Sequence, residues 1–420
     1  MIKMMLKILL IVGDGMADRP IKELHGKTPL EVASKPNIDE LASRSALGLW
    51  DPLGPGLRPG SDTAHLALFG YDPRRYYPGR GPFEALGVGA ELRPGEVALR
   101  GNFATVDDNL IVIDRRAGRS LPENPELVKY LNDNIQHVDG VEVRFYSATE
   151  HRVAVVLRGS ALSADVSDTD PHEVGVKVLQ SKALCDDEKA IKTANVINKL
   201  TLLTYKLLKD HPLNLKRIEN GLPPANIILF RGAGQMSYIP KLSERGDIIL
   251  NKYLAISATA LVIGVAKSVG FDVITPPGVT GGINTNLSSK AESAIQALKG
   301  DYELVYLHVK GTDAASHDGN LEAKIKMIEQ IDGMIGKIID NIDLGSTIVA
   351  ITADHATPIY VRDHTGDPVP LAIYSPFIIC DGIKSFSERS ARRGSLGRLR
   401  SVDLMHTLLD QANRIRKYGA

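Results

Sequence analysis

The stretch KILLIVGDG, residues 7–15, is a short apolar run that ends in an aspartate between two glycines. Such a run is typical of a strand buried on both faces of a parallel sheet. Three further runs share this character: NIILF (226–230), LVYLHV (304–309) and TIVAIT (347–352). Apolar helical patterns are predicted at 252–269 and 321–342. Strands that alternate with helices predict a doubly wound, mostly parallel α/β sheet, in which functional groups gather at the carboxyl ends of the strands.

The length of the chain predicts a second domain. Its 420 residues exceed the roughly 250–300 that one hydrophobic core supports. The middle of the chain has strands with more polar interruption, expected at 97–106, 110–113, 141–147 and 152–157, and a long helix at 188–208. Gly- and Pro-rich segments flank this region at 79–82 and 221–224. We therefore expect a catalytic domain of residues 1–82 and 225–420, interrupted by a smaller α+β domain of residues 83–224.

The composition limits the partners. Lys plus Arg and Asp plus Glu both number 50, so the net charge of zero gives no support for a nucleic-acid partner or an anionic membrane. Two cysteines cannot form a disulfide framework, which fits a reducing cytoplasm. The N-terminal apolar run is broken by Lys7 and leads into Gly-Asp-Gly, so a first strand is favoured over a signal peptide. Whether the chain forms a homo-oligomer is left open.

Acidic and histidine residues follow three of the expected strands. The six residues are Asp14, Asp313, His317, Asp354, His355 and His364. Each alone is equally compatible with a turn or a helix cap. Strand ends of one parallel sheet converge, however, and an unpaired cluster of these groups would be repulsive. Carboxylate plus imidazole suits Zn or Mn better than Ca, and six ligands exceed the three protein ligands typical of one catalytic zinc. Two ions about 3.5–4 Å apart are therefore expected.

Ser61 has two interpretations. It lies in PGSDTAH (59–65), just before a short helical pattern at 64–69. It is either the N-cap of that helix or a nucleophile that a metal ion holds as an alkoxide, with the helix N-terminus helping to bind a phosphate.

These motifs together resemble the alkaline phosphatase superfamily, and most of all its archaeal-type cofactor-independent phosphoglycerate mutases. The shared motifs of the catalytic part are GDGMAD (13–18), GSDTAHL (60–66), DAASH (313–317), TADH (352–355) and HTGDPVP (364–370). Those of the insert are RGNFATVD (100–107), DRRAGR (114–119), EHR (150–152) and DTDPH (168–172). The late motifs are common to phosphatases and sulfatases, whereas the insert motifs indicate the mutases.

The resemblance implies an alkaline-phosphatase-like fold and a mutase that interconverts 3-phosphoglycerate and 2-phosphoglycerate in glycolysis and gluconeogenesis. It implies two divalent ions and no 2,3-bisphosphoglycerate. Mn²⁺ is favoured, and Zn²⁺, Mg²⁺ and Co²⁺ remain open. One ion would be held by Asp313, His317 and His364, and the other by Asp14, Asp354, His355 and Ser61. Ser61 would become phosphoserine and return the phosphoryl group to the other hydroxyl of the reoriented glycerate.

The resemblance also implies that the inserted domain acts as a lid, because a mutase must keep water out. Arginines would clamp the substrate carboxylate from the lid (Arg115, Arg116, Arg119, Arg152) and from the core side (Arg231). His151, Asp168 and His172 would relay protons between the glycerate hydroxyls. Each of these five arginines could equally be a surface residue, and His151, Asp168 and His172 could equally make only hydrogen bonds within loops. Relatives carry a lysine where this chain has Ile263, so any phosphate contact of that lysine must be supplied otherwise.

Two alternatives are weighed against the mutase. A metal-dependent phosphatase or phosphodiesterase of the same superfamily would use water as acceptor, and it would gain nothing from a lid that excludes water. A metal-binding protein without catalysis would not need a serine at the metals.

Overall fold

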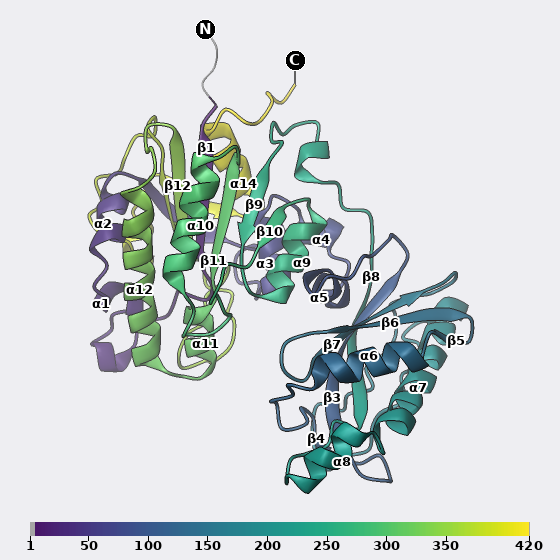
Figure 1. Cartoon of the computed structure of the whole chain (residues 1–420). Helices are drawn as coiled ribbons and strands as arrows, with labels where there is room; N and C mark the ends of the chain where they lie inside the picture. Colours follow the sequence, from purple (N-terminus) through teal and green to yellow (C-terminus); the bar gives the residue numbers. More distant parts are fainter. Residues whose placement is uncertain (1–4, 420) are drawn as a thin grey trace. The chain divides into compact units, whose positions relative to one another are not determined.

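The computed structural model describes residues 5–419, which form two compact units. The larger unit contains the residues up to Tyr77 and those from Ile239 onward, and the smaller unit is Pro78–Tyr238 (Figure 1). The smaller unit thus extends beyond the expected 83–224 at both ends. It includes the helix α5 (Arg80–Gly87) at its N-terminal end and the strand β8 (Ile227–Gln235) at its C-terminal end.

The larger unit is built on an eight-stranded sheet of order β10-β9-β11-β1-β12-β13-β2-β14. The five strands from β10 to β12 run parallel, and β13 pairs antiparallel with both β12 and β2. The strands are β1 (Lys7–Gly13), β2 (Ala46–Asp51), β9 (Tyr253–Ile256), β10 (Asp272–Ile274), β11 (Leu304–Val309), β12 (Thr347–Thr352), β13 (Val369–Tyr374) and β14 (Gly397–Arg400). The mostly parallel α/β sheet predicted from the sequence is confirmed.

Helices cover both faces of this sheet. In Figure 1, α10 and α12 lie in front of the parallel strands and α14 lies behind them. The helices of this unit are α1 (Pro29–Val32), α2 (Pro36–Ser43), α3 (Ser61–Leu68), α4 (Pro73–Tyr76), α9 (Ala260–Ser268), α10 (Leu287–Lys299), α11 (Gly311–His317), α12 (Leu321–Ile339), α13 (Glu388–Ala391) and α14 (Asp403–Gln411). Short 3₁₀ turns occur at η1 (Lys22–Leu24) and η2 (Leu242–Glu244).

One predicted helix of the larger unit is wrong. The apolar run 252–269 is the strand β9 followed by the helix α9, with a break at residues 257–259. β9 is entirely buried, and α9 is apolar at every position before Lys267, so the run has no polar face from which its period could be recognised.

The smaller unit has an antiparallel sheet of its own. Its path is β4-β3-β7-β6-β5, and β8 also pairs with β3. The strands besides β8 are β3 (Val97–Val106), β4 (Val112–Asp114), β5 (His137–Val138), β6 (Val141–Ser147) and β7 (Arg152–Arg158). The helices besides α5 are α6 (Asn124–Asn134), α7 (Glu188–Leu208) and α8 (Pro212–Glu219).

The run at 226–230 was predicted to be a parallel strand of the catalytic sheet, and this is wrong. It forms β8, which pairs antiparallel with β3 in the smaller unit. The run is uniformly apolar because β8 is buried between β3 and α7. Arg231 therefore belongs to the smaller unit and does not lie on the core side.

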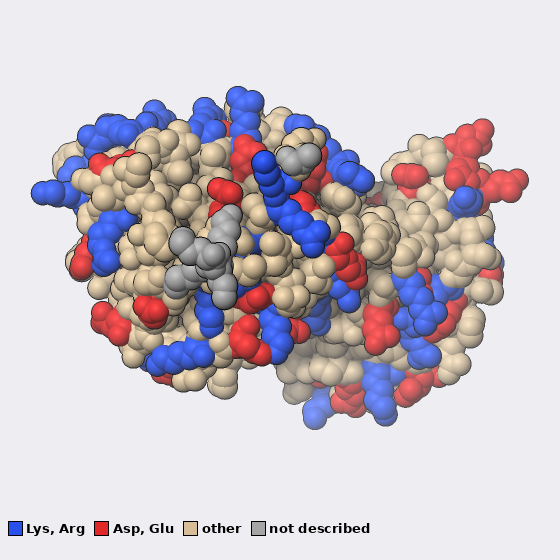
Figure 2. Space-filling view, turned by 90° about the horizontal axis from the view of Figure 1, so that it is seen from above, with Lys and Arg blue, Asp and Glu red and all other residues tan. Residues whose placement is uncertain are grey.

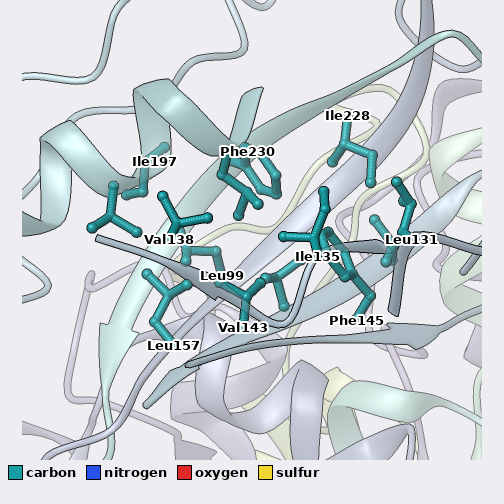
Figure 3. Packing of buried hydrophobic residues seen from close by; sticks show 14 of the residues in the cluster. Leu99, Leu131, Ile135, Val138, Val143, Phe145, Leu157, Ile197, Ile228 and Phe230 are labelled. Carbon is teal, nitrogen blue, oxygen red and sulfur yellow. The ribbon is translucent and has the colours of Figure 1, made fainter. Parts of the chain in front are cut away.

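The smaller unit has its own hydrophobic core. Figure 3 shows Leu99, Leu157 and Phe230 from the sheet packed with Ile197 of α7 and Leu131 of α6. These side chains are at most 2% exposed. A separate core of this kind is what an independently folding domain requires.

The surface has mixed charge. Figure 2 shows basic and acidic side chains interspersed over one face, in agreement with the zero net charge. Within residues 5–419, no helix combines the length and apolar character that a membrane crossing requires. Cys185 and Cys380 are both exposed and unpaired.

Candidate functional site

Three neighbouring strands of the larger unit end at one point of the sheet. β1 lies between β11 and β12 and is parallel to both. Asp14 directly follows β1. Asp354 lies two residues after the end of β12, and Asp313 lies in α11, which follows β11. All three carboxylates are at most 1% exposed. The strand ends therefore bring Asp14 close to two residues that lie about 300 and 340 positions later in the sequence.

Asp14, Asp354 and His355 form one group whose ligand atoms all lie within 4.8 Å of one another. His355 Nε2 is 3.1 Å from Asp354 Oδ2 and 3.5 Å from Asp14 Oδ1. These two carboxylate oxygens are buried and have no hydrogen-bond donor. Buried, unpaired carboxylate oxygens are costly unless a cation binds them. The donor set thus fits a divalent metal ion.

Ser61 faces this group. Its Oγ lies 3.2 Å from His355 Nε2, and the residue is 8% exposed. The N-cap of α3 is Gly60, and Ser61 is the first residue of the helix proper. The N-cap interpretation of Ser61 is therefore wrong, and its hydroxyl is directed to the cluster instead.

Asp313, His355 and His364 form a second compact group. His364 Nε2 lies 3.6 Å and His317 Nε2 lies 3.3 Å from Asp313 Oδ1. Each of these two histidines contacts a backbone carbonyl through Nδ1, His317 that of Arg362 at 2.8 Å and His364 that of Pro59 at 2.9 Å. Since a carbonyl only accepts, Nδ1 carries the proton in both rings and Nε2 is available as a ligand. The structure thus brings all six expected ligands together, although the compact second group contains His355 and not His317.

The electrostatics of the cluster are dominated by its carboxylates. Burial opposes charge on His355, but Asp354, Asp14 and Asp313 raise the pKa of His355 to about 9. Burial and the neighbouring His355 lower the pKa of His364. Burial works against ionisation of Asp14, yet Lys310 and His308 hold the pKa of Asp14 well below its usual value. Asp14 is therefore ionised at neutral pH and attracts cations.

Three residues around the ligands were not found from the sequence. Lys310 Nζ lies 3.3 Å from Asp14 Oδ2 and 2.6 Å from Asp313 Oδ2. His308 Nε2 donates to Asp14 Oδ2 at 2.9 Å. Thr357 donates to Asp313 Oδ1 at 2.9 Å. Lys310 directly follows β11, so the strand-end rule could have found it; His308 is hidden within a buried strand, and Thr357 lies in a loop.

In the smaller unit, Arg115 is held by a buried aspartate. It donates to both carboxylate oxygens of Asp170, at 2.9 and 2.7 Å, and Asp170 is 0% exposed. His172 Nε2 lies 3.2 Å from Asp168 Oδ2, and Asp168 Oδ1 accepts from the backbone N–H of Gly232. His172 Nδ1 also lies 3.2 Å from a guanidinium nitrogen of Arg115. Three predicted substrate residues, Arg115, Asp168 and His172, therefore form one hydrogen-bonded cluster with Asp170.

The other predicted residues of this unit differ in exposure. Arg116, Arg119 and Arg152 are exposed, and Arg119 pairs with Glu150 at 3.3 Å. Burial, followed by the charge of Arg152, lowers the pKa of the buried His151 to about 4, so this ring is neutral at pH 7. A neutral, buried imidazole whose Nδ1 has no partner can accept or donate a proton.

A further arginine joins Arg231 and was not predicted. Arg100 on β3 is paired in register with Arg231 on β8. Burial lowers the pKa of Arg231, partly offset by Asp170, and nearby guanidinium groups lower it further. Burial likewise lowers the pKa of Arg100 to about 10, partly offset by Glu84. The Nε of Arg231 is buried without an acceptor. Such crowded cations are suited to an anionic ligand.

Known proteins resemble this chain over its whole length. The profile of the 2,3-bisphosphoglycerate-independent phosphoglycerate mutases matches residues 42–214. Proteins of that name from Ignicoccus hospitalis and Metallosphaera sedula are 58% and 55% identical, each over 99% of both chains. A solved structure of a Pyrococcus horikoshii protein has a TM-score of 0.85 at 40% identity, with 100% of both chains covered. The structure of a cofactor-independent phosphoglycerate mutase from Thermoplasma acidophilum has a TM-score of 0.72 at 34% identity, covering 97% of this chain and 100% of that one. The chain belongs to the family of 2,3-bisphosphoglycerate-independent phosphoglycerate mutases.

Proposed function

We propose that this chain is an isomerase that interconverts 3-phosphoglycerate and 2-phosphoglycerate through a phosphoserine at Ser61. The observation that carries the proposal is the position of the Ser61 hydroxyl. It lies 3.2 Å from His355 Nε2, beside two buried carboxylate oxygens that have no donor. A hydroxyl in that position is suited to become a nucleophile.

Two divalent ions are part of the proposal. Asp313, His317 and His364 would hold one, and Asp14, Asp354, His355 and Ser61 the other. When bound, the ions supply charge that lowers the pKa of the Ser61 hydroxyl and neutralises the phosphoryl oxygens. Mn²⁺ is the ion we favour, with Zn²⁺, Mg²⁺ and Co²⁺ as alternatives. We propose that 2,3-bisphosphoglycerate is not required.

The chain itself positions the nucleophile. Ser61 opens α3, so the positive end of this eight-residue helix favours an anionic phosphoryl group there. His65, one turn along, donates from Nδ1 to the carbonyl of Ser61 at 2.5 Å and accepts from the Tyr306 hydroxyl at 2.6 Å. Both contacts are buried, so they fix the backbone from which the nucleophile projects.

The smaller unit is proposed to bind the substrate carboxylate and to act as the lid that excludes water. Arg115, Arg116, Arg119, Arg152 and Arg231 are the proposed cations, with Arg100 added by its place beside Arg231. His151, Asp168 and His172 are the proposed proton carriers. A small phosphorylated carboxylate is thus the expected partner. A cytoplasmic location and the lack of nucleic-acid or membrane partners stay predictions.

The test is an assay with 3-phosphoglycerate, Mn²⁺ and no 2,3-bisphosphoglycerate. We expect 2-phosphoglycerate to form without free phosphate, and Ser61→Ala to abolish this while keeping the metal content of the wild type. Free phosphate without 2-phosphoglycerate would favour a phosphatase. Turnover by Ser61→Ala at the wild-type rate would remove the phosphoserine from the mechanism.

A further inference from the structure

Thr357 joins the two groups of proposed metal ligands. Its side chain is 0% exposed. Its Oγ1 lies 2.9 Å from Asp313 Oδ1 and 3.0 Å from His355 Nδ1. One hydroxyl therefore touches the carboxylate of Asp313 and the imidazole of His355, which the proposed function assigns to different ions.

The directions of these two hydrogen bonds follow from the groups involved. An ionised carboxylate only accepts, so the single hydroxyl proton of Thr357 is given to Asp313. The oxygen of Thr357 must then accept the proton of His355 Nδ1. Nε2 is consequently the ring atom directed to Ser61 Oγ and Asp354 Oδ2, at 3.2 and 3.1 Å.

The backbone of Thr357 is held rigidly. Its N–H donates to the carbonyl of Ala17 at 3.2 Å, and its carbonyl accepts from the buried ammonium of Lys324 at 3.0 Å. Gly15 lies directly beside it, and a Cβ on Gly15 would come within 2.6 Å of Thr357 Oγ1. The hydroxyl is thus fixed from both sides, as a residue that orients a ligand must be.

We propose that Thr357 is a positioning residue, which sets the tautomer of His355 and couples its orientation to that of Asp313. The inference rests on the proposed function, because it concerns the proposed metal ligands. Histidine ligands of metals generally donate their second N–H to a fixed acceptor, and loss of that acceptor costs about 10–100-fold in metal affinity. The alternative is that Thr357 only fills space in the loop.

The test compares Thr357→Val with Thr357→Ser by calorimetric titration with Zn²⁺ alone. Valine keeps the shape without the hydroxyl, and serine keeps the hydroxyl without the methyl group. We expect Thr357→Val to bind Zn²⁺ about 10–100-fold more weakly than the wild type, and Thr357→Ser within about threefold of it. Equal affinity of Thr357→Val and the wild type would overturn the proposal, as would equal loss in both variants. A wild-type protein that binds no Zn²⁺ would instead refute the metal site itself.

A second measurement does not depend on the folding of a variant. Nitrogen-15 NMR of histidine-labelled wild type with Zn²⁺ reports which ring nitrogen carries the proton, with His355 assigned by comparison with His355→Asn. We expect His355 to be protonated at Nδ1. Protonation at Nε2 would contradict the inferred hydrogen bond. In Thr357→Val, or in Thr357→Ala if the valine variant does not fold, we expect the Nδ1–H signal to shift.

Discussion

Gly15 offers a sharp test of how closely the proposed ligands are packed. It directly follows Asp14 and has a φ of +63°. A Cβ at this position would lie 2.6 Å from Thr357 Oγ1 and 2.9 Å from both Cβ and Oδ1 of Asp313. Because these neighbours are buried and hydrogen-bonded to each other, neither can move away at low cost. We therefore expect Gly15→Ala to destabilise the larger unit and to disturb both groups of ligands.

The expected loss in the free energy of unfolding of Gly15→Ala has two parts. The left-handed backbone costs a residue with a Cβ about 1–2 kcal/mol. Overpacking of a filled site costs about 1–3 kcal/mol more. The matched control is Gly26→Ala, because Gly26 has a φ of +78° and no atom within 4 Å of its Cβ position. Only the backbone cost applies to the control, so the two variants should differ by about 1–3 kcal/mol, or roughly 2–12 °C in Tm.

The assay is thermal unfolding of the metal-free protein, followed by tryptophan fluorescence. Trp50 is the only tryptophan of the sequence, and it is 0% exposed on β2 of the larger unit. Its signal therefore reports the unit that contains Gly15 and not the other one. Calorimetric titration with Zn²⁺ measures the disturbance of the proposed ligands. We expect Gly15→Ala to bind Zn²⁺ more weakly than the wild type and Gly26→Ala to bind it equally well.

Two results would refute this reasoning. If both variants melt at the same temperature, the close approach to Asp313 and Thr357 is absent in solution. If Gly15→Ala is destabilised but binds Zn²⁺ as the wild type does, the packing is real and the link between Gly15 and the ligands is wrong.

Three further predictions concern other parts of the chain. Lys324→Met leaves the buried carboxylate of Asp18 without its ammonium partner and should lower the free energy of unfolding by about 3–5 kcal/mol. Lys337→Met, on the same helix, breaks the exposed pair with Glu292 and should lower it by less than about 1 kcal/mol. Urea unfolding followed by Trp50 fluorescence measures both. The pKa of His355 is raised from 6.5 to about 9, so this group stabilises the metal-free fold fully below pH 6.5 and loses that contribution as the pH rises through 9. Metal binding at pH 7 should accordingly release a proton from His355, and calorimetry in buffers of different ionisation enthalpy that finds no proton release would contradict this. Arg152→Gln should raise the KM for 3-phosphoglycerate at least about tenfold, which corresponds to a loss of about 1.4 kcal/mol or more of binding free energy. Arg144→Gln, which changes an exposed arginine, should leave the KM unchanged. Equal KM values for the two variants would exclude Arg152 from the substrate site.

The sequence predicts those elements whose signal is local. β11 and β12 have the expected bounds, and β1 extends only one residue further, because each is a buried apolar run that ends abruptly at polar residues. The strand β8 has the same local signal, but its pairing partner is determined by the fold. It was therefore placed in the wrong sheet, and Arg231 was misplaced with it. An apolar run predicts a buried strand, but it does not say which sheet buries it.

The same distinction applies to the site. Asp14, Asp313 and Asp354 could be predicted to lie together because the carboxyl ends of parallel strands converge, a rule that needs only the position of each strand. Thr357 lies only two residues beyond His355, yet its role depends on the direction in which its hydroxyl points. Motif spacing cannot give that direction, since it arises from backbone hydrogen bonds to Ala17 and Lys324 that join distant segments.

These hydrogen bonds also bear on how the ligands divide between two ions. By distance alone His355 belongs to both compact groups, with Asp14 and Asp354 or with Asp313 and His364. Its Nδ1 is already engaged by Thr357, so only Nε2 can bind a metal. Nε2 lies 3.1 Å from Asp354 Oδ2 and 3.5 Å from Asp14 Oδ1, the two oxygens without a donor. We infer that His355 serves the ion beside Ser61. The ion proposed at Asp313 and His364 would then need a third ligand, and His317 Nε2, 3.3 Å from Asp313 Oδ1, is an imidazole nitrogen in position to provide it.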